Sequence, residues 1–160
     1  MEPTISIKDD SKKALQELET VRNFLAHMKK AGVQYIFQFP ETTSETDEQL
    51  LGKILQSKQY RDSLMGFFDS WKRRKREISK AIAKTISSNP AEPDQIKNLN
   101  CYILPFGCDG YFNPPSEIFI NVLHGDAETQ LETVAHEALH LIYQTHTKKF
   151  SYKKTEQFID

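Results

Sequence analysis

Three residues of the segment TVAHEALH have the types and spacing that bind and use a metal ion: His136, Glu137 and His140, in the pattern HExxH. On a helix, two imidazoles four residues apart lie about 40° apart around the axis and one turn along it, so both can reach one ion. Glu137 lies about 60° from His140 around the axis, close enough to act on a metal-bound water without being a ligand. The pattern predicts half of a zinc site together with a general base.

The residues around the motif indicate that the helix is buried on the side away from this polar stripe. The opposite side is apolar, with Leu131, Val134, Ala135, Ala138, Leu139 and Ile142. A buried helix that carries His, Glu and His needs partners for these polar groups. A bound Zn²⁺ supplies them. The structural alternative is a pair of histidines satisfied on a partly exposed helix face without metal.

The pattern resembles the zincin metallopeptidases, in which HExxH lies on an active-site helix packed beneath a small sheet, and the resemblance covers about residues 98–160. In one branch, the metzincins, a third His follows the second by six residues, and His146 has this spacing. That branch ends the helix with a turn at a Gly, whereas this chain has Tyr143 there. If the helix continues, His146 lies about 240° around the axis from His140 and points away from the metal.

The other branch, the gluzincins, takes its third ligand from a Glu on the next helix, often with an Asp four residues later. The segment KKTEQFID contains Glu156 and Asp160 at this separation, so both carboxylates can face the active-site helix. The resemblance implies Zn²⁺ on His136, His140 and Glu156, with Asp160 accepting the free N–H of His136. We prefer Glu156 to His146 as third ligand. Because Asp160 ends the sequence, the resemblance is to a minimal gluzincin, unless the chain is truncated.

This resemblance implies a zinc metallopeptidase, and more narrowly an endopeptidase. Zinc would lower the pKa of its bound water to about 7, and Glu137 would remove the proton and later deliver it to the leaving amine. A nearby donor would stabilise the oxyanion, for which Tyr143, Tyr152 and His146 are the candidates.

The resemblance also implies where a substrate binds. Zincins have an edge strand above the metal that pairs with an extended peptide or protein substrate. The candidate is GYFNPPSEIFINV, which begins at Gly110 and ends at Val122. Pro114 and Pro115 would keep part of that edge unpaired.

Hydrophobic periodicity and turn residues predict the elements that position these residues. A mainly helical N-terminal part, residues 1–90, comprises a helix over 11–30, a short strand over 33–39 and a helical stretch over 48–87 broken near 57–59. Residues 89–98 are a candidate linker. Residues 98–160 form the zincin-like region: strands over 101–106 and 117–122, which can pair, a helix over 127–143 capped by Asp126, and a short helix from about Lys153. The fold class is α+β, a small mixed sheet with the HExxH helix, in one compact unit.

Two other features point to different classes of function. The segment WKRRKREISKAIAK carries Lys72, Arg73, Arg74, Lys75 and Arg76, a candidate surface for nucleic acid or another partner. We favour its simpler interpretation, the solvated face of a helix whose apolar side is buried. A non-catalytic metal module built from Cys101, Cys108 and the two histidines of the motif is the other alternative, but the spacing of the cysteines is unusual for a zinc finger.

The composition fits one globular domain. The chain has 160 residues, of which 38% are hydrophobic, and a formal net charge of −1, so no global field draws it to nucleic acid or an anionic membrane. Its apolar runs are too short to span a bilayer, and its first residues lack the apolar core of a signal peptide. With only two cysteines, these features favour a cytoplasmic location, although export without a leader stays open.

Overall fold

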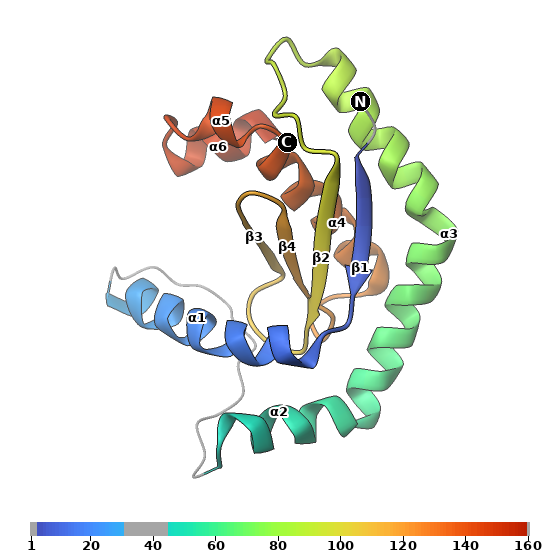
Figure 1. Cartoon of the computed structure of the whole chain (residues 1–160), viewed down its shortest axis with the longest axis vertical. Helices are drawn as coiled ribbons and strands as arrows, with labels where there is room; N and C mark the ends of the chain where they lie inside the picture. Colours follow the sequence, from blue (N-terminus) through green and yellow to red (C-terminus); the bar gives the residue numbers. More distant parts are fainter. Residues whose placement is uncertain (1–2, 31–44, 160) are drawn as a thin grey trace.

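The computed structural model describes residues 3–30 and 45–159. Figure 1 shows the elements in chain order: β1 (Thr4–Lys8), α1 (Ser11–Lys30), α2 (Asp47–Gln56), α3 (Lys58–Ser88), β2 (Asn98–Leu104), β3 (Gly110–Asn113), β4 (Glu117–Asn121), α4 (Ala127–Ile142), α5 (Gln144–Thr147) and α6 (Tyr152–Ile159). The strand expected over residues 33–39 lies outside the described residues. None of the helices in the described ranges is long and apolar enough to cross a membrane.

The four strands form one mixed sheet in the order β1-β2-β4-β3. β1, β2 and β4 run parallel, and β3 forms an antiparallel hairpin with β4. The predicted α+β class with a small mixed sheet is therefore confirmed. The two strands predicted to pair do so as β2 and β4. Periodicity did not predict β1 or β3, although the edge strand implied by the resemblance, Gly110 to Val122, contains β3.

The helix boundaries follow local capping residues. α1 begins after Asp10, whose carboxylate accepts hydrogen bonds from the backbone N–H of Lys12 and Lys13. The predicted break in the second helical stretch occurs at Ser57, which ends α2 and caps α3 by accepting a hydrogen bond from the N–H of Tyr60. The predicted helices over 11–30 and 48–87 are confirmed, the second as the pair α2 and α3.

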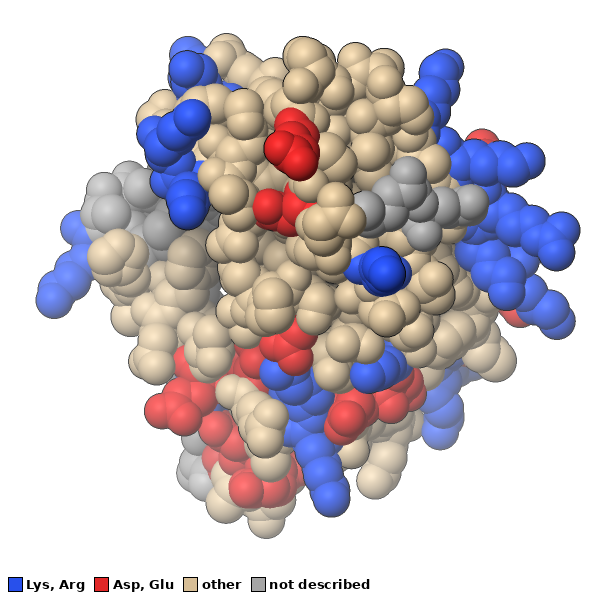
Figure 2. Space-filling model, turned by 45° about the horizontal axis from the view of Figure 1, so that its top comes forward, with Lys and Arg blue, Asp and Glu red and all other residues tan. Residues whose placement is uncertain are grey.

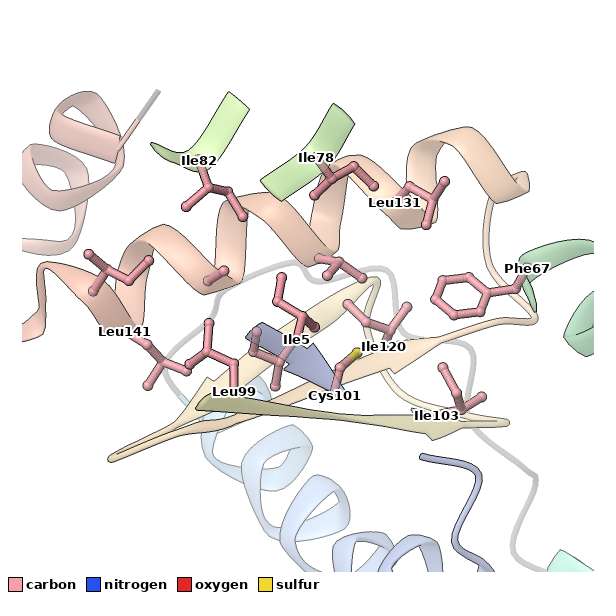
Figure 3. Close-up of a cluster of buried hydrophobic side chains, with 14 of the residues drawn as sticks. Ile5, Phe67, Ile78, Ile82, Leu99, Cys101, Ile103, Ile120, Leu131 and Leu141 are labelled. Carbon is pink, nitrogen blue, oxygen red and sulfur yellow. The ribbon is translucent and has the colours of Figure 1, made fainter. Parts of the chain in front are cut away.

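The sheet has helices on both faces. Alternate residues of β2 and β4 point to α3 and α4, where the main core contains Ile5, Phe67, Ile78, Ile82, Leu99, Cys101, Ile103, Ile120, Leu131 and Leu141 (Figure 3). The intervening residues point to α1 and α2, where a second cluster contains Ala14, Leu18, Val21, Leu51, Leu104, Phe106 and Phe119. Because α4 packs between the sheet and α3, the helix that carries HExxH is held on two sides.

Candidate metal centre

The helix α4 has firm local signals at both ends. The Asp126 carboxylate accepts hydrogen bonds from the N–H and the hydroxyl of Thr129, at 2.9 and 3.0 Å, and so caps the first turn. The helix ends at Ile142, and Tyr143 leaves the helical conformation with φ −110° and ψ 16°. Leu131, Val134 and Ala138 face the core, as the sequence predicted. The side chains of His136, Glu137 and His140 leave the helix on a different side, where Glu137 and His140 are still buried and His136 is half-buried.

Three ligand atoms meet beside this helix. The Nε2 atoms of His136 and His140 lie 3.0 Å apart, and each lies 3.3 Å from a carboxylate oxygen of Glu156 on α6. His140 is buried, whereas His136 and Glu156 are half-buried, which leaves one side open. Among the residues that the structure describes, these are the His, Cys, Asp or Glu side chains that come close enough together to hold a metal ion.

The group fits zinc in both chemistry and spacing. Two imidazole nitrogens and one carboxylate oxygen are a ligand set of catalytic zinc sites, which keep a fourth position for water. With metal–ligand distances of 2.0–2.1 Å in a tetrahedron, neighbouring ligand atoms lie about 3.3 Å apart. The distance of 3.0 Å between the two Nε2 atoms is close to this value, and so are the two distances of 3.3 Å, from His136 to Oε2 and from His140 to Oε1 of Glu156.

The structure brings Glu156, and not His146, to the two histidines. After α4 ends, the single turn α5 carries His146 to the aromatic side chains of the chain end, where its ring stacks on Phe158 at 4.9 Å. Phe158 also contacts the ring edge of Tyr143 at 5.3 Å. These contacts pack α6 against the end of α4. The sequence alternative, a third ligand six residues after His140, fails because α4 neither continues to His146 nor turns it toward the motif.

Glu137 lies in the interior next to the three ligand atoms. Its side chain is buried, and this burial is the main cause that raises the pKa of Glu137 to about 8. The negative charge of Glu156 is the smaller cause. A cation held by the neighbouring residues would favour the charged carboxylate and act against this shift. Glu137 is thus a buried carboxyl group with a pKa near neutrality, which suits a group that exchanges protons.

The edge strand β3 lies directly against α4. The ring of Phe112 on β3 stacks on the imidazole of His140, with centroids 5.1 Å apart and planes at 12°. Two residues earlier, a Cβ on Gly110 would come within 2.6 Å of the Thr133 methyl group on α4. Glycine at this position therefore permits the close approach of strand and helix that places Phe112 on the histidine.

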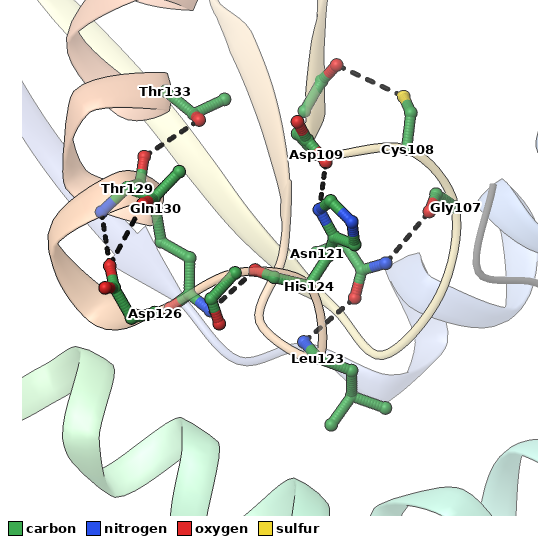
Figure 4. A network of polar contacts seen from close by, with 12 residues as sticks. Gly107, Cys108, Asp109, Asn121, Leu123, His124, Asp126, Thr129, Gln130 and Thr133 are labelled. Atoms are coloured by element: carbon green, nitrogen blue, oxygen red, sulfur yellow. Dashed lines mark hydrogen bonds and ion pairs between the residues drawn. The ribbon is translucent and has the colours of Figure 1, made fainter. Parts of the chain in front are cut away.

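Polar contacts of the loops hold β3 and α4 in place (Figure 4). The sequence did not predict these contacts. The buried amide of Asn121 donates to the carbonyl of Gly107, 2.9 Å away, in the loop that leads to β3. The amide of Gln130 on α4 donates to the carbonyl of His124, at 3.0 Å. The His124 ring contacts the Asp109 carboxylate. A sequence signal existed, because buried Asn and Gln side chains need specific partners.

The remaining predicted site residues have different surroundings. Tyr143 is 1% exposed, and its hydroxyl has no hydrogen-bond partner within residues 3–30 and 45–159; burial raises its pKa. Tyr152, the first residue of α6, is 71% exposed and lies one turn before Glu156. Asp160, expected to orient His136, lies outside the described residues.

The two cysteines do not join the metal group among the described residues. Cys101 is buried in the core, where burial raises the pKa of its thiol. The half-buried Cys108 thiol donates to the carbonyl of Gly110 at 3.2 Å. The zinc-finger arrangement with these cysteines is therefore not supported.

The helix α4 supplies two imidazoles beneath a mixed sheet, and the following helix α6 supplies a carboxylate. Together they define a candidate zinc-enzyme centre. The chain matches, over residues 10–160, the model of a family described as "Putative zinc dependent peptidase (DUF5700)". This match spans most of the chain, which therefore belongs to that family. No curated protein matches the chain, and no solved structure matches it.

Proposed function

We propose that this protein is a zinc-dependent peptidase with a zincin-like site of the gluzincin type. The observation that carries the proposal is the cluster of His136, His140 and Glu156, in which the two Nε2 atoms lie 3.0 Å apart and each lies 3.3 Å from one oxygen of the Glu156 carboxylate, beside the buried Glu137. The sheet adds support, because the HExxH helix packs beneath it next to an antiparallel edge strand. Membership of the family is consistent with this chemistry.

His136, His140 and Glu156 would hold the metal, which when bound supplies Lewis-acid activation of a water molecule. Glu137 acts as the general base: its carboxylate takes a proton from the attacking water and passes it to the nitrogen of the leaving amine. Glu137 is buried beside these ligands, and a cation held there would favour the charged carboxylate that the base requires. The aromatic ring of Phe112 holds the plane of the His140 imidazole.

The proposed substrate is an extended peptide that lies along the free side of β3. β3 is an edge of the sheet, so one side of its backbone can pair with an added strand. A peptide there would pass next to His140, because Phe112 of β3 stacks on that ring. The sequence placed the substrate along Gly110 to Val122. Within this segment only β3 is an edge, since β4 lies between β2 and β3, so we propose β3 as the strand that pairs with the substrate.

Of the candidate oxyanion donors, we propose Tyr152. It is exposed and lies one helical turn before Glu156, so it shares the face of α6 that carries this ligand. The hydroxyl of Tyr143 is buried, and the ring of His146 stacks on Phe158. A donor for the reacting carbonyl must reach the open side of the metal centre, which favours the exposed tyrosine.

The proposal is tested by measuring zinc content and peptide cleavage on the same purified samples. We expect one zinc per chain in the wild type, lost in His140→Ala and Glu156→Ala and kept in the control His146→Ala. Glu137→Gln should keep zinc and lower turnover of a peptide library by about 100-fold or more, because only the proton carrier is removed. Full turnover in Glu137→Gln would refute the mechanism. A wild type that binds zinc and cleaves no peptide would indicate a non-catalytic metal-binding module instead.

A further inference from the structure

β1 forms the edge of the sheet opposite to β3 and has no second partner strand among the described residues. β1 pairs with β2 in parallel, and the N–H of Thr4 donates to the carbonyl of Lys97 at 2.9 Å. In a parallel ladder, every second residue points its N–H and C=O groups toward the partner strand, and the residues between them point these groups away from it. For β1 these are Ile5 and Ile7, whose backbone groups make no hydrogen bond on that side within the described chain. An open strand edge of this kind is a template for an added strand.

A cleft runs between this edge and α3, which lies beside β1 in Figure 1. Its volume is about 390 Å³, and its lining residues are Pro3, Thr4, Ile5, Trp71, Lys75, Arg76 and Ser79. β1 thus supplies backbone groups on one side, and α3 supplies an aromatic ring and two cationic side chains on the other. This combination suits an extended chain with acidic side chains.

The charge on the α3 side is not neutralised within the described chain. Lys75 and Arg76 are exposed and form no ion pair there. Arg74 differs, because it pairs with Glu77 on α3, at 2.9 Å, and with Glu128 on α4. Figure 2 shows Lys and Arg side chains projecting from the side of the molecule that α3 forms. The cations next to the open strand are therefore available to an anionic partner.

We propose that β1 and α3 form a docking site for an extended acidic segment of a partner protein, which adds a strand to β1 and places carboxylates on Lys75 and Arg76. A second copy of the chain fits poorly, because pairing two β1 edges would bring two basic α3 helices together. A nucleic acid could meet the charges but has no peptide groups for the backbone of Ile5 and Ile7. β1 and β3 are opposite edges, so this site is independent of the proposed peptidase site.

Trp71 makes the proposal directly measurable. It is the single tryptophan of the chain and lines the cleft, so its fluorescence reports an occupant. The probe is an acetylated and amidated eight-residue peptide of alternating Val and Glu, titrated into the full-length protein. We expect a saturable fluorescence change, and none with the matched Val–Lys peptide. The double variant Lys75→Glu/Arg76→Glu should weaken binding of the acidic peptide at least about tenfold.

The matched control is Lys80→Glu/Lys84→Glu, which makes the same charge change on exposed positions of α3 outside the cleft lining. We expect this control to change the affinity by less than about threefold. That small change should shrink as the salt concentration rises. If the first double variant fails to fold by circular dichroism, Lys75→Gln/Arg76→Gln takes its place with the same expectation. Equal weakening by both pairs would overturn the site, because it would indicate general attraction to a basic helix.

Three further measurements separate strand addition from its rivals. The same acidic peptide with every backbone amide N-methylated keeps its charges and loses its donors, and it should bind at least about tenfold more weakly. Equal binding of the methylated peptide would overturn strand addition. Displacement of the peptide by a twelve-residue oligothymidylate at equal concentration would assign the surface to nucleic acid instead. Sedimentation of the free protein as a dimer that the peptide dissociates would assign it to a second copy.

Discussion

The face of the sheet that carries α3 and α4 is packed with apolar side chains, whereas the face under α1 also contains a polar network. On the first face, Phe67, Cys101 and Val134 are completely buried. On the second, the hydroxyl of Tyr111 donates to Glu17 at 2.7 Å, and Lys13 lies 3.1 Å from Glu117. The apolar face determines where the HExxH helix lies, because α4 belongs to it. The polar face connects α1 to the β3–β4 hairpin.

This difference matters because the candidate site lies on the apolar face and is linked to the polar face through β3. His136, His140 and Glu137 come from α4, whose position depends on apolar packing. Phe112, which stacks on His140, comes from β3, and the preceding residue of that strand points to α1. Substitutions on the two faces should therefore separate stability of the fold from the geometry of the metal centre.

The largest effect is expected from Phe67→Ala on the apolar face. Phe67 is 0% exposed and lies in the core among Leu131 and Ile103 (Figure 3), so its removal leaves a cavity between α3, α4 and the sheet. The free energy of unfolding should fall by about 3–5 kcal/mol, measured by urea denaturation. The control is Met65→Ala on the same helix, which is 60% exposed and should change stability by less than about 0.5 kcal/mol. Similar small losses in both variants would contradict the assignment of this core.

A smaller effect with a more specific signature is expected from Gly110→Ala, where β3 meets α4. The new Cβ would come within 2.6 Å of the Thr133 methyl group and 3.0 Å of the Phe119 carbonyl oxygen, so strand and helix must separate. We expect a loss of about 1–3 kcal/mol in the free energy of unfolding. Zinc affinity, measured by competition with a chelator, should fall as well, because Phe112 would shift from His140.

Gly66→Ala is the matched control for that variant. Gly66 lies inside α3, and a Cβ there would meet nothing within 4 Å. Alanine should raise the free energy of unfolding by about 0.5–1 kcal/mol, because glycine is unfavourable inside helices. Zinc affinity should not change. A Gly110→Ala protein with unaltered zinc affinity would show that the contact of β3 with α4 does not position the metal ligands.

Local signals in the sequence were sufficient for the helices and for the HExxH motif. The HExxH spacing, the Asp126 cap and the break at Ser57 depend on residues within one or two turns of each other, so periodicity and capping predicted them. Glu156 followed from a family resemblance, and its position in the fold agrees with that expectation. The sequence already favoured Glu156 over His146, on the expectation that the helix continues past Tyr143. In the structure α4 ends at Ile142, and His146 lies away from the motif because its ring stacks on Phe158.

The sheet was harder to predict, because its strands depend on distant partners. β1 has five residues and gains its hydrogen bonds from β2, more than ninety residues later in the chain. β3 has only four residues between turn-forming segments, a run too short for alternation to mark it as a strand, although its partner β4 follows directly in the chain. Parallel order cannot be derived from alternation along a single strand. Polar pairs such as Tyr111 and Glu17 are likewise 94 residues apart.

The smallest effect is expected from Tyr111→Phe on the polar face. This variant tests most directly whether the two faces of the sheet act separately. Glu17 is 8% exposed and would lose the hydroxyl donor at 2.7 Å while retaining Lys13 at 3.6 Å. The free energy of unfolding should fall by about 1–2 kcal/mol, because a buried acceptor loses one partner. Zinc affinity should stay unchanged, since Tyr111 points away from α4.

A double-mutant cycle completes this test, with Tyr111→Phe and Glu17→Gln measured singly and together by urea denaturation. If the hydroxyl and the carboxylate stabilise each other directly, the loss in the double variant should be smaller than the sum of the single losses by about 1 kcal/mol. Strict additivity would mean that the contact contributes nothing to holding β3 against α1. A fall in zinc affinity in Tyr111→Phe would mean that the two faces are coupled through β3, and that the polar network helps to position the metal centre.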